Sequence, residues 1–358
     1  MKDFSVNTKS IPPAEPWPQG GLENVGKCPI CGSLARETLH KELDDQVFFC
    51  APGNWTLYRC TACGSGYLDP RPTPEAIGLA YRQYSTHVPS TRLASEELSA
   101  VRRLRRALAN GYRNAKFGTN RQPSIALSTW MLRWLPRQLA ILDREARHLR
   151  RAERGETLLD VGCGSGGFLE LATEMGWKAE GVDFDPQAVK VARQRGLVVH
   201  QGGIETLGDR AEYYDVVTLS HVIEHVHDPV CLLRSCFRLL KPGGRLWLET
   251  PNLESTGHVY YGRNWRGLEP PRHLVLFTWA SLGSALSRAG FTGVKPLRPQ
   301  PLANRIFSAS ANIVKGRDSP RNTGNSIDLR WRAWCADRKA KRLPITGEFI
   351  TISAQKPL

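Results

Sequence analysis

A glycine-rich turn at residues 158–168, LLDVGCGSGGF, constrains the fold more than any other feature of this sequence. An apolar run leads into the turn and a helical pattern follows it, so the turn joins a predicted strand to a predicted helix. Its glycines let the backbone come very close to a ligand. Asp183 ends the next predicted strand, twenty-three residues after Asp160. A carboxylate in that place can accept hydrogen bonds from both ribose hydroxyls of a nucleoside.

Predicted strands and helices alternate along residues 151–358, the part of the chain that contains this turn. Further strands are expected in the segments AEGVDFD, LVVHQG, YYDVVTLS, RLWLETPN and ITGEFITISAQ. The helical segment PQAVKVARQRG begins with a proline and ends on a glycine, and PVCLLRSCFRLLKPGG has a helical apolar stripe followed by a Pro-Gly-Gly stop. This alternation predicts an α/β domain with a mostly parallel, doubly wound sheet.

Two C-x2-C pairs indicate a small metal-binding module at residues 27–74. CPIC supplies Cys28 and Cys31, and CTAC, after twenty-eight intervening residues, supplies Cys60 and Cys63. Each pair can present two thiolates to one ion, and two such pairs complete a tetrahedral four-cysteine zinc site, as in a zinc ribbon. All four positions are then taken by protein, so the zinc is expected to be structural. Four unrelated buried cysteines, or a redox pair, are the alternatives.

Two further segments precede the alternating pattern: a loose, proline-containing leader at 1–26 and a basic helical region at 75–150. The chain carries a net charge of +15, and residues 92–154 hold fifteen Arg or Lys against five Asp or Glu. Such a surface favours acidic partners, namely nucleotide-linked substrates, anionic lipid or nucleic acid. Arginines that only solvate helix faces are the simpler alternative.

Localisation follows from what the sequence lacks. No segment approaches the ~18 uninterrupted apolar residues of a membrane span, and the first residues have no apolar core of a signal peptide. We therefore expect a cytoplasmic protein whose cysteines stay reduced. The Trp- and Arg-rich helices at 101–150 suit a peripheral position on the anionic inner face of a membrane. A lid over a pocket or a dimer interface fits them equally.

Four blocks resemble, in order and spacing, the class I S-adenosylmethionine (SAM)-dependent methyltransferases: LLDVGCGSGGFLE, GVDFDP, YYDVVTLSHVIEHV and LLKPGGRLWLETPN, within residues 156–255. The resemblance implies a Rossmann-like sheet of seven strands and SAM as the cofactor. It places the methionine part of SAM in the glycine turn, the ribose on Asp183 and the adenine beside Phe184. The other cofactor contacts that it implies are Asp160, Gly162, Cys163, Gly164, Gly166, Gly203, Ile204, Ser220 and His221.

The stretch HVIEHVHDP, residues 221–229, contains the H-x-x-E-H signature of inverted zinc proteases. A protease needs that motif on a continuous helix, whereas here a predicted strand ends directly before it and Pro229 follows closely. The stretch instead resembles the E-x-x-E-H segment of ubiquinone-pathway O-methyltransferases and small-RNA 2′-O-methyltransferases, which holds a divalent metal. That resemblance implies a cation, softer than Mg²⁺, at His221, Glu224 and His225. Alternatively, Glu224 and His225 only brace the loop.

A further block, PPRHLVLFT followed by the helical segment SLGSALSRAGF, resembles bacterial methyltransferases associated with surface-polysaccharide and lipid biosynthesis. Deoxysugar C-methyltransferases have a histidine in the same place and also carry an N-terminal four-cysteine zinc module. The resemblance makes His273 the candidate general base. Those enzymes have a tyrosine and a glutamate where this chain has Pro270 and Arg272, which favours methylation of oxygen. A histidine that only packs or braces a loop is the alternative.

Together these features predict a SAM-dependent O-methyltransferase whose acceptor is a sugar, a nucleotide sugar, or a polysaccharide- or lipid-linked intermediate. Transfer from a sulfonium requires mainly an in-line approach in a site that excludes water. We expect direct displacement with His273 as the base, and with Glu224 and His225 shaping the pocket or holding a cation. The alternatives are RNA 2′-O-methylation with phosphates on the basic region, a small-molecule O-methyltransferase like those of the quinone pathway, and a non-catalytic SAM-fold binding protein.

Overall fold

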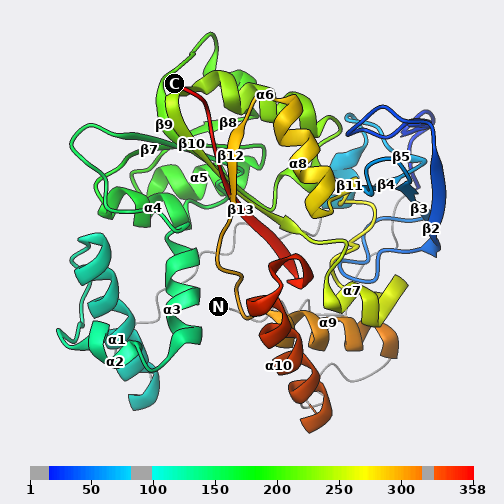
Figure 1. Cartoon of the computed structure of the whole chain (residues 1–358). Coiled ribbons are helices and arrows are strands. Elements are labelled where there is room, and N and C mark those ends of the chain that lie inside the picture. The colour runs from blue at the N-terminus through cyan, green and yellow to red at the C-terminus, as the bar shows by residue number, and fades with distance from the viewer. Residues whose placement is uncertain (1–15, 82–98, 317–325) are drawn as a thin grey trace.

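The computed structural model describes residues 16–81, 99–316 and 326–358. A seven-stranded sheet has helices on both faces, a smaller sheet lies beside it, and a group of helices lies at one end of the molecule (Figure 1). The strands of the large sheet are β6 (Thr157–Val161), β7 (Lys178–Asp183), β8 (Val198–Gln201), β9 (Tyr214–Ser220), β10 (Leu240–Pro251), β12 (Thr292–Pro296) and β13 (Phe349–Gln355).

The strand order of the large sheet is β12-β13-β10-β9-β6-β7-β8. Strands β6 to β10 pair in parallel, whereas β13 runs antiparallel to both of its neighbours. The chain winds outward from β6 to β8 and then returns to place β9 on the other side of β6. This switch of direction confirms the predicted doubly wound, Rossmann-like sheet of seven strands.

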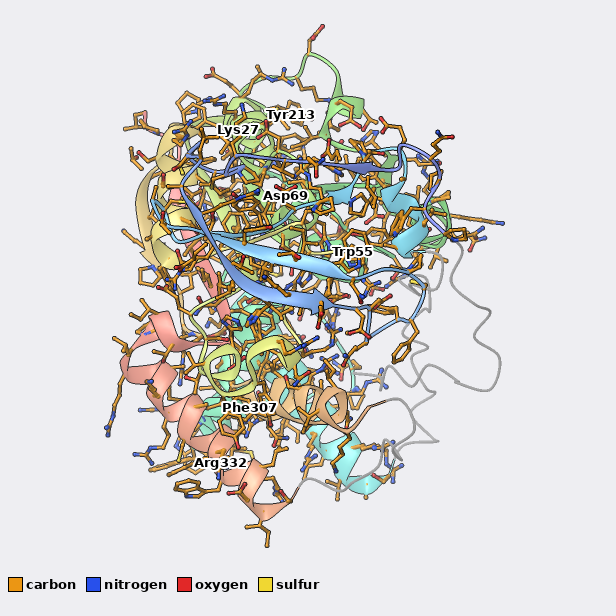
Figure 2. All side chains as sticks on the ribbon, turned by 90° about the vertical axis from the view of Figure 1, so that its right-hand side faces the viewer. Lys27, Trp55, Asp69, Tyr213, Phe307 and Arg332 are labelled. Atoms are coloured by element: carbon orange, nitrogen blue, oxygen red, sulfur yellow. The ribbon has the colours of Figure 1, made fainter. Side chains whose placement is uncertain are left out.

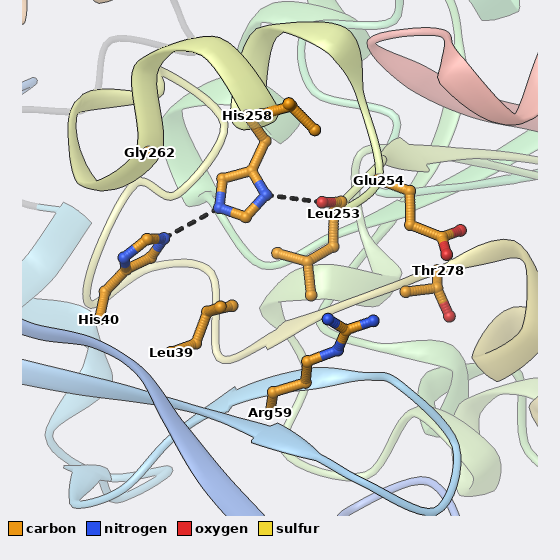
Figure 3. Close-up of a pocket in the computed structure, with 9 residues that line it drawn as sticks. Leu39, His40, Arg59, Leu253, Glu254, His258, Gly262 and Thr278 are labelled. Atoms are coloured by element: carbon orange, nitrogen blue, oxygen red, sulfur yellow. Dashed lines mark hydrogen bonds between the residues drawn. The ribbon is translucent and has the colours of Figure 1, made fainter.

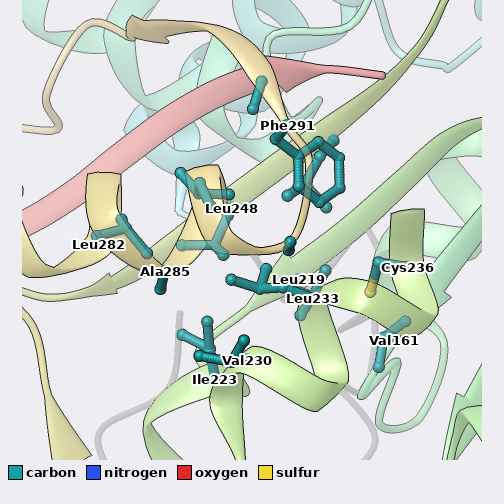
Figure 4. Close-up of a cluster of buried hydrophobic side chains, with 14 of the residues drawn as sticks. Val161, Leu219, Ile223, Val230, Leu233, Cys236, Leu248, Leu282, Ala285 and Phe291 are labelled. Carbon is teal, nitrogen blue, oxygen red and sulfur yellow. The ribbon is translucent and has the colours of Figure 1, made fainter. Parts of the chain in front are cut away.

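Alternate residues of the central strands supply two hydrophobic cores, one on each face of the sheet. Leu158 of β6 belongs to one buried cluster and its neighbour Leu159 to the other, as the side-chain period of two requires. Figure 4 shows the second cluster, which contains Leu233 and Leu282 of two helices and Leu219 of β9. The helices that cover the two faces are α4 (Gly167–Glu174) and α5 (Pro186–Gln194) on one, and α6 (Pro229–Leu239) and α8 (Trp279–Arg288) on the other.

The smaller sheet contains the cysteine pairs and is completed by a strand from the far side of the sequence. It has the order β11-β4-β3-β2, all antiparallel. Three strands come from the expected zinc module, while β11 follows the PPRH segment of the large domain. The cysteine module therefore shares a sheet with the methyltransferase-like part. The bounds are β2 (Arg36–Leu43), β3 (Trp55–Cys60), β4 (Gly66–Leu68) and β11 (Val275–Leu276).

The last part of the expected leader is attached to this module. Residues 1–15 lie outside the described residues, but β1 (Leu22–Glu23) pairs with β5 (Arg71–Pro72). The carboxylate of Asp69 also accepts hydrogen bonds from the backbone N–H of Val25, at 3.0 Å, and of Gly26, at 3.2 Å. Residues 22–26 are thus attached to the cysteine module.

The remaining helices lie at one end of the molecule (Figure 1). The guanidinium of Arg137 links the basic region to the C-terminal helices, donating to the carbonyl oxygen of Pro301 at 3.1 Å and lying 4.0 Å from the Asp337 carboxylate. No helix of the described residues is long and apolar enough to cross a bilayer. These helices are α1 (Ala100–Phe117), α2 (Ser128–Leu132), α3 (Pro136–Glu145), α7 (Thr256–Tyr261), α9 (Ala303–Lys315) and α10 (Ile327–Arg342). Short 3₁₀ turns connect other elements along the chain: η2 (Ile77–Tyr81), η4 (Ile204–Leu207), η5 (Ile223–His225), η6 (Gly262–Asn264) and η7 (Pro344–Thr346).

Candidate active site

The glycine-rich turn connects β6 to α4, as predicted, and its backbone is shaped for close contact. Gly162 and Gly164 have φ angles of 70° and 54°, a region that side chains disfavour. A Cβ on Gly162 would come within 2.5 Å of the Val222 side chain, whereas one on Gly164 would meet no atom within 4 Å. The turn is therefore packed against the segment after β9 on one side and open on the other, where a ligand can approach.

Asp183, the predicted ribose ligand, ends β7 beside this turn. Its carboxylate accepts hydrogen bonds from the backbone N–H of Gly164, at 2.7 Å, and of Asp185, at 2.9 Å. Burial raises the pKa of Asp183 above its ordinary value, and the two hydrogen bonds oppose that rise. Each carboxylate oxygen keeps a second lone pair, so the group is fixed in place and can still accept from ribose hydroxyls.

The residues predicted around the adenine come together at the edge formed by β7 and β8. Phe184 is 73% exposed, and a Cβ on Gly203 would lie 2.8 Å from its ring. The side chain of Ile204 belongs to a hydrophobic core, and that of Cys163 packs close to Gly181 of β7. Ile204 and Cys163 can therefore meet a cofactor only through their backbone, whereas the Phe184 ring is free to stack on a base.

Asp160 takes part in a buried ion pair beneath the glycine turn. Its carboxylate lies 3.1 Å from Nη2 of Arg147 and accepts from the Thr218 hydroxyl at 2.7 Å. Burial raises the pKa of Asp160, and the Arg147 charge opposes this. The Arg147 guanidinium also stacks 4.2 Å from the Phe168 ring centroid and 4.7 Å from that of Trp247. Asp160 thus fixes an arginine at the base of the turn.

Arg144, at the end of α3, makes a second pair at the carboxyl edge of the sheet. Its Nε donates to Oε1 of Glu249 at 2.8 Å, and its Nη2 donates to the Ser220 hydroxyl at 3.3 Å. Neither Arg144 nor Arg147 was singled out from the sequence, because both lie in a long basic run without a distinguishing spacing. The basic helical region therefore supplies two cations to the predicted cofactor pocket.

His221 is held between two carboxylates rather than facing a metal position. Nδ1 of its ring lies 3.2 Å from Oε1 of Glu224, and Nε2 lies 3.4 Å from Oε1 of Glu249. Burial would lower the pKa of His221, but the hydrogen bonds to the two glutamates outweigh it and raise the pKa to about 9. A protonated imidazole has no lone pair to offer a metal. That His221 binds a cation stays a prediction, and the group of possible metal ligands found in the described residues contains Glu224, His225 and His273 instead.

The three predicted catalytic residues meet in one place, although His273 lies far along the chain from the other two. One ligand atom each of Glu224, His225 and His273 lie within 4.8 Å of one another. The two segments are joined by a hydrogen bond of 2.8 Å from the Leu274 backbone N–H to the Glu224 carbonyl oxygen. Glu224 and His273 are almost fully buried. The structure thus brings a carboxylate and two imidazoles together beside the glycine turn.

The hydrogen bonds of the two imidazoles fix which ring nitrogen carries the proton. Nδ1 of His225 donates to the Arg272 carbonyl oxygen at 2.9 Å, and Nδ1 of His273 donates to the Gly267 carbonyl oxygen at 2.8 Å. Burial lowers the pKa of His273 to about 4, so this ring is neutral near pH 7. Its Nε2 therefore carries a lone pair, which can accept a proton or bind a cation.

The four cysteines of the module also meet, as predicted. Sγ of Cys28 lies 3.6 Å from Sγ of Cys63, and the same distance separates Cys31 and Cys60. All four sulfurs lie within 4.8 Å of one another. Four thiolates bound at about 2.3 Å to one tetrahedral ion require sulfur separations of this size. The cluster therefore fits a structural zinc ion.

Comparison with known proteins agrees with the geometry of the cofactor pocket. Residues 131–295 match the family described as "Methyltransferase domain". The ubiquinone biosynthesis O-methyltransferase of Nitrosospira multiformis is 36% identical over 132 residues, which cover 35% of this chain and 53% of that protein. The enzyme of the same name from Xanthomonas oryzae pv. oryzae is 41% identical over 105 residues, covering 27% and 44%. The chain spans about half the length of these curated relatives.

Among solved structures, a SAM-dependent methyltransferase from Archaeoglobus fulgidus is 24% identical and has a TM-score of 0.41, covering 63% of this chain and 94% of the other. The family match includes α3, the glycine turn, the segment after β9 and the PPRH segment. It thus contains Asp160, Asp183, Glu224, His225 and His273. Residues 131–295 of this chain thus match a methyltransferase domain.

Proposed function

We propose that the whole chain is an O-methyltransferase that moves the methyl group of SAM directly to a hydroxyl of its acceptor. One observation carries this proposal: Val222 packs against Gly162, so the segment bearing Glu224 and His225 lies directly on the cofactor turn. His273 joins that segment through the Leu274–Glu224 hydrogen bond. A neutral imidazole therefore lies beside the place where the methyl group is expected, and a hydroxyl is the acceptor for which a base of this kind is useful.

In the proposed reaction the acceptor oxygen attacks the methyl carbon, the carbon–sulfur bond breaks, and S-adenosylhomocysteine is released. The hydroxyl proton passes to Nε2 of His273, whose Nδ1–H is fixed on the Gly267 carbonyl oxygen. Glu224 is held by the Thr250 hydroxyl at 3.0 Å and by His221, and so keeps its orientation. Alignment of the oxygen with the carbon–sulfur bond supplies most of the rate acceleration.

A divalent cation held by Glu224, His225 and His273 is a second candidate mechanism. Both imidazoles donate Nδ1–H to a backbone carbonyl, which is the outer-shell arrangement of histidines that ligate metals through Nε2. One carboxylate and two imidazoles suit an ion softer than Mg²⁺. A cation there would lower the pKa of a bound hydroxyl, and His273 would then be a ligand rather than the base.

For the acceptor we propose a sugar, a nucleotide sugar, or a polysaccharide- or lipid-linked intermediate. The cysteine module forms one sheet with β11, the strand that follows the PPRH segment, and the presence of both features in one chain favours a sugar. The names of the curated relatives favour a quinone-pathway intermediate instead. The match to this chain, however, covers only about half of the length of those relatives.

The experiment that tests the proposed function uses labelled SAM with cell extracts separated into lipid, RNA, protein and small-molecule pools. Label in a glycan- or nucleotide-sugar-containing pool supports the sugar acceptor, and label in a quinone precursor supports the second acceptor class. Label in RNA, or in no pool, overturns both. Asp183→Asn is the matched inactive control, because it keeps the side-chain shape and removes the charge that accepts the ribose hydroxyls.

The peripheral membrane position belongs to the same proposal, and the first observation for it is an outward apolar stripe on α10. Ile327, Trp331 and Trp334 are exposed and lie at i, i+4 and i+7, one face of a helix. Ala333 and Ala336 lie on the buried face. A surface helix normally turns its apolar side inward, so the tryptophan stripe of α10 indicates an interacting surface.

A second outward stripe lies around α2, at the same end of the molecule. Trp130 and Trp134 are 62% and 78% exposed, and Leu127 and Leu135 beside them are also exposed. In Figures 1 and 2, which differ by 90°, α10 and the α1–α2 pair both lie at the lower end. Arg137 joins the two groups of helices.

An anionic bilayer is the partner that these two stripes fit best. Helix α1 contains six Arg or Lys and no acidic residue, and α10 contains six against two. Tryptophan and arginine together suit the boundary between headgroups and acyl chains. Two copies of this chain joined through the same end would bring their basic helices together and repel one another.

A further inference from the structure

A cavity of about 310 Å³ lies at the seam between the smaller sheet and the methyltransferase domain (Figure 3). One wall comes from β2 and β3 of the cysteine module. The other comes from the residues after β10, from α7 and from Thr278, the N-cap of α8. None of its lining residues belongs to the glycine turn. The volume is at the lower end of the range for small-molecule sites.

This cavity is tied to the catalytic cluster by two short stretches of chain. Leu253, which lines it, is three residues beyond Thr250, whose hydroxyl binds Glu224. Thr278, which also lines it, is five residues beyond His273. An extended chain rises at most ~3.6 Å per residue, so the separations are no more than about 11 Å and about 18 Å. The cavity therefore lies within about 18 Å of the catalytic cluster, a distance that an acceptor longer than one sugar ring can span.

Arg59 supplies a positive charge to the cavity. Its side chain reaches into the space between Leu253 and Thr278 (Figure 3). Within the described parts of the chain, no carboxylate forms an ion pair with it. Its charge contributes to the lowered pKa of His258, after burial and against the hydrogen bond to Leu253. A guanidinium with free donors in a concave site is suited to a carboxylate or a phosphate.

His40 and His258 form a neutral polar wall. Nδ1 of His258 donates to the Leu253 carbonyl oxygen at 2.6 Å, so its Nε2 accepts the 2.9 Å hydrogen bond from Nε2 of His40. Burial lowers the pKa of both rings, that of His40 to about 4. Nδ1 of His40 is therefore an acceptor, and no hydrogen bond occupies it within residues 16–81, 99–316 and 326–358. The Glu254 carboxylate is a second acceptor at the exposed edge of the same cavity.

We propose that this cavity is an acceptor subsite that binds a negatively charged sugar, either a sugar phosphate or a uronic acid. Arg59 binds the anionic group, while His40 and Glu254 accept hydrogen bonds from sugar hydroxyls. The apolar side chains of Leu39 and Leu253 contact the carbon–hydrogen face of the ring. The subsite rests on the proposed O-methyltransferase function and narrows its acceptor to an anionic glycan or glycosyl phosphate. It also gives the cysteine module a role, because β2 and β3 form one wall.

The test measures binding of three probes to the full zinc-loaded chain saturated with S-adenosylhomocysteine: glucose 1-phosphate, glucuronate and glucose. Isothermal titration is done at constant ionic strength. At least one anionic probe should bind about tenfold or more tightly than glucose, since a charge-assisted contact contributes about that factor. If glucose 1-phosphate binds more tightly than glucuronate, phosphate is the recognised group, and the reverse order identifies carboxylate.

Arg59→Ala should remove the preference for the anion, and Arg59→Lys should keep part of it. Lys41→Ala removes an exposed cation of β2 outside the cavity lining and serves as the matched control. Equal affinity for all three probes, or a preference that survives Arg59→Ala, overturns the subsite while S-adenosylhomocysteine still binds. Absence of S-adenosylhomocysteine binding by the wild-type chain overturns the proposed function and the subsite with it.

Discussion

His221 and Glu249 face one another across the ends of β9 and β10, with 3.4 Å between Nε2 and Oε1. Glu224 contacts the other ring nitrogen, and the two glutamates raise the pKa of His221 to about 9 in spite of its burial. A folded-state pKa above the unfolded value of about 6.5 means that the native state binds the proton more tightly. The resulting stabilisation is complete below about pH 6.5 and is lost as the pH rises through about 9.

We therefore expect the free energy of unfolding of the wild-type chain to fall by about 1–2 kcal/mol between pH 6.5 and pH 9.5, a figure reduced for partial solvent screening. His221→Asn should abolish this decline, and asparagine tolerates the φ of 56° at this position. Urea denaturation at three pH values measures this fall in the free energy of unfolding for both proteins. His200→Asn, which alters a partly exposed pair with Glu180, is the control. An equal decline in His221→Asn would contradict the assignment.

Arg147→Met should be among the most destabilising substitutions in the domain. It leaves the Asp160 carboxylate buried without its cation, and breaking a buried pair in this way costs roughly 3–5 kcal/mol. Arg150→Met removes an exposed pair with Glu156 from the same basic segment and should change stability by less than about 1 kcal/mol. Urea denaturation distinguishes them. Similar effects of the two substitutions would show that Arg147 is not a buried partner.

The sheet and most of the site could be predicted because they depend on local patterns. The glycine turn, Asp183 and the cysteine pairs each have a fixed spacing, and the alternation of strands and helices fixes the winding of the sheet. The edge strand β12 was not predicted, because its sequence, TGVKP, does not alternate apolar and polar residues and is exposed throughout. The ion pairs of Arg144 with Glu249 and of Arg147 with Asp160 were not predicted either. Only the packing of α3 against the sheet edge brings these residues together.

The pH dependence of methyl transfer should distinguish the two roles of His273. With burial lowering its pKa to about 4, a base at this position is already deprotonated at pH 5. The kcat of the wild-type chain should therefore show no fall between about pH 8 and pH 5.5 from this group, and His273→Ala should lower kcat while leaving S-adenosylhomocysteine affinity unchanged.

The matched variant for that experiment is His258→Ala, a second buried histidine outside the catalytic cluster. It should raise the acceptor KM without the same loss of kcat. Activity that disappears with a chelator, while the structural zinc is retained by elemental analysis, would favour a cation on Glu224, His225 and His273. Full activity of His273→Ala would exclude both roles.

Removal of the zinc site should also disturb the active site, because the cysteine module shares a sheet with β11. Elemental analysis should find about one zinc per chain, lost in Cys28→Ser/Cys60→Ser. Because β4 of the module pairs with β11, two residues beyond His273, loss of zinc should lower methyl transfer as well as the Tm. Cys231→Ser, an exposed cysteine of α6, is the control and should change neither. A fully active zinc-free variant would show that the module is independent.

Binding to lipid vesicles tests whether the two tryptophan stripes contact an anionic bilayer. The wild-type chain should sediment with phosphatidylcholine vesicles that contain one third phosphatidylglycerol, and added salt should weaken that binding because the basic helices contribute to it. Trp130→Ala/Trp134→Ala and Trp331→Ala/Trp334→Ala should each lower the partition coefficient by about tenfold or more, since each removes two aromatic anchors. Leu34→Ala, which trims a side chain 76% exposed on the cysteine module, should leave it unchanged.

Light scattering on the same variants separates a membrane from a second copy of the chain as the partner. A monomeric wild-type chain that binds only anionic vesicles supports the bilayer, because both the apolar stripes and the positive charge are then used. A dimer that either double substitution dissociates would instead assign the stripes to self-association. Binding to pure phosphatidylcholine at the same strength would show that charge has no part, and the basic composition of α1 and α10 would then need another partner.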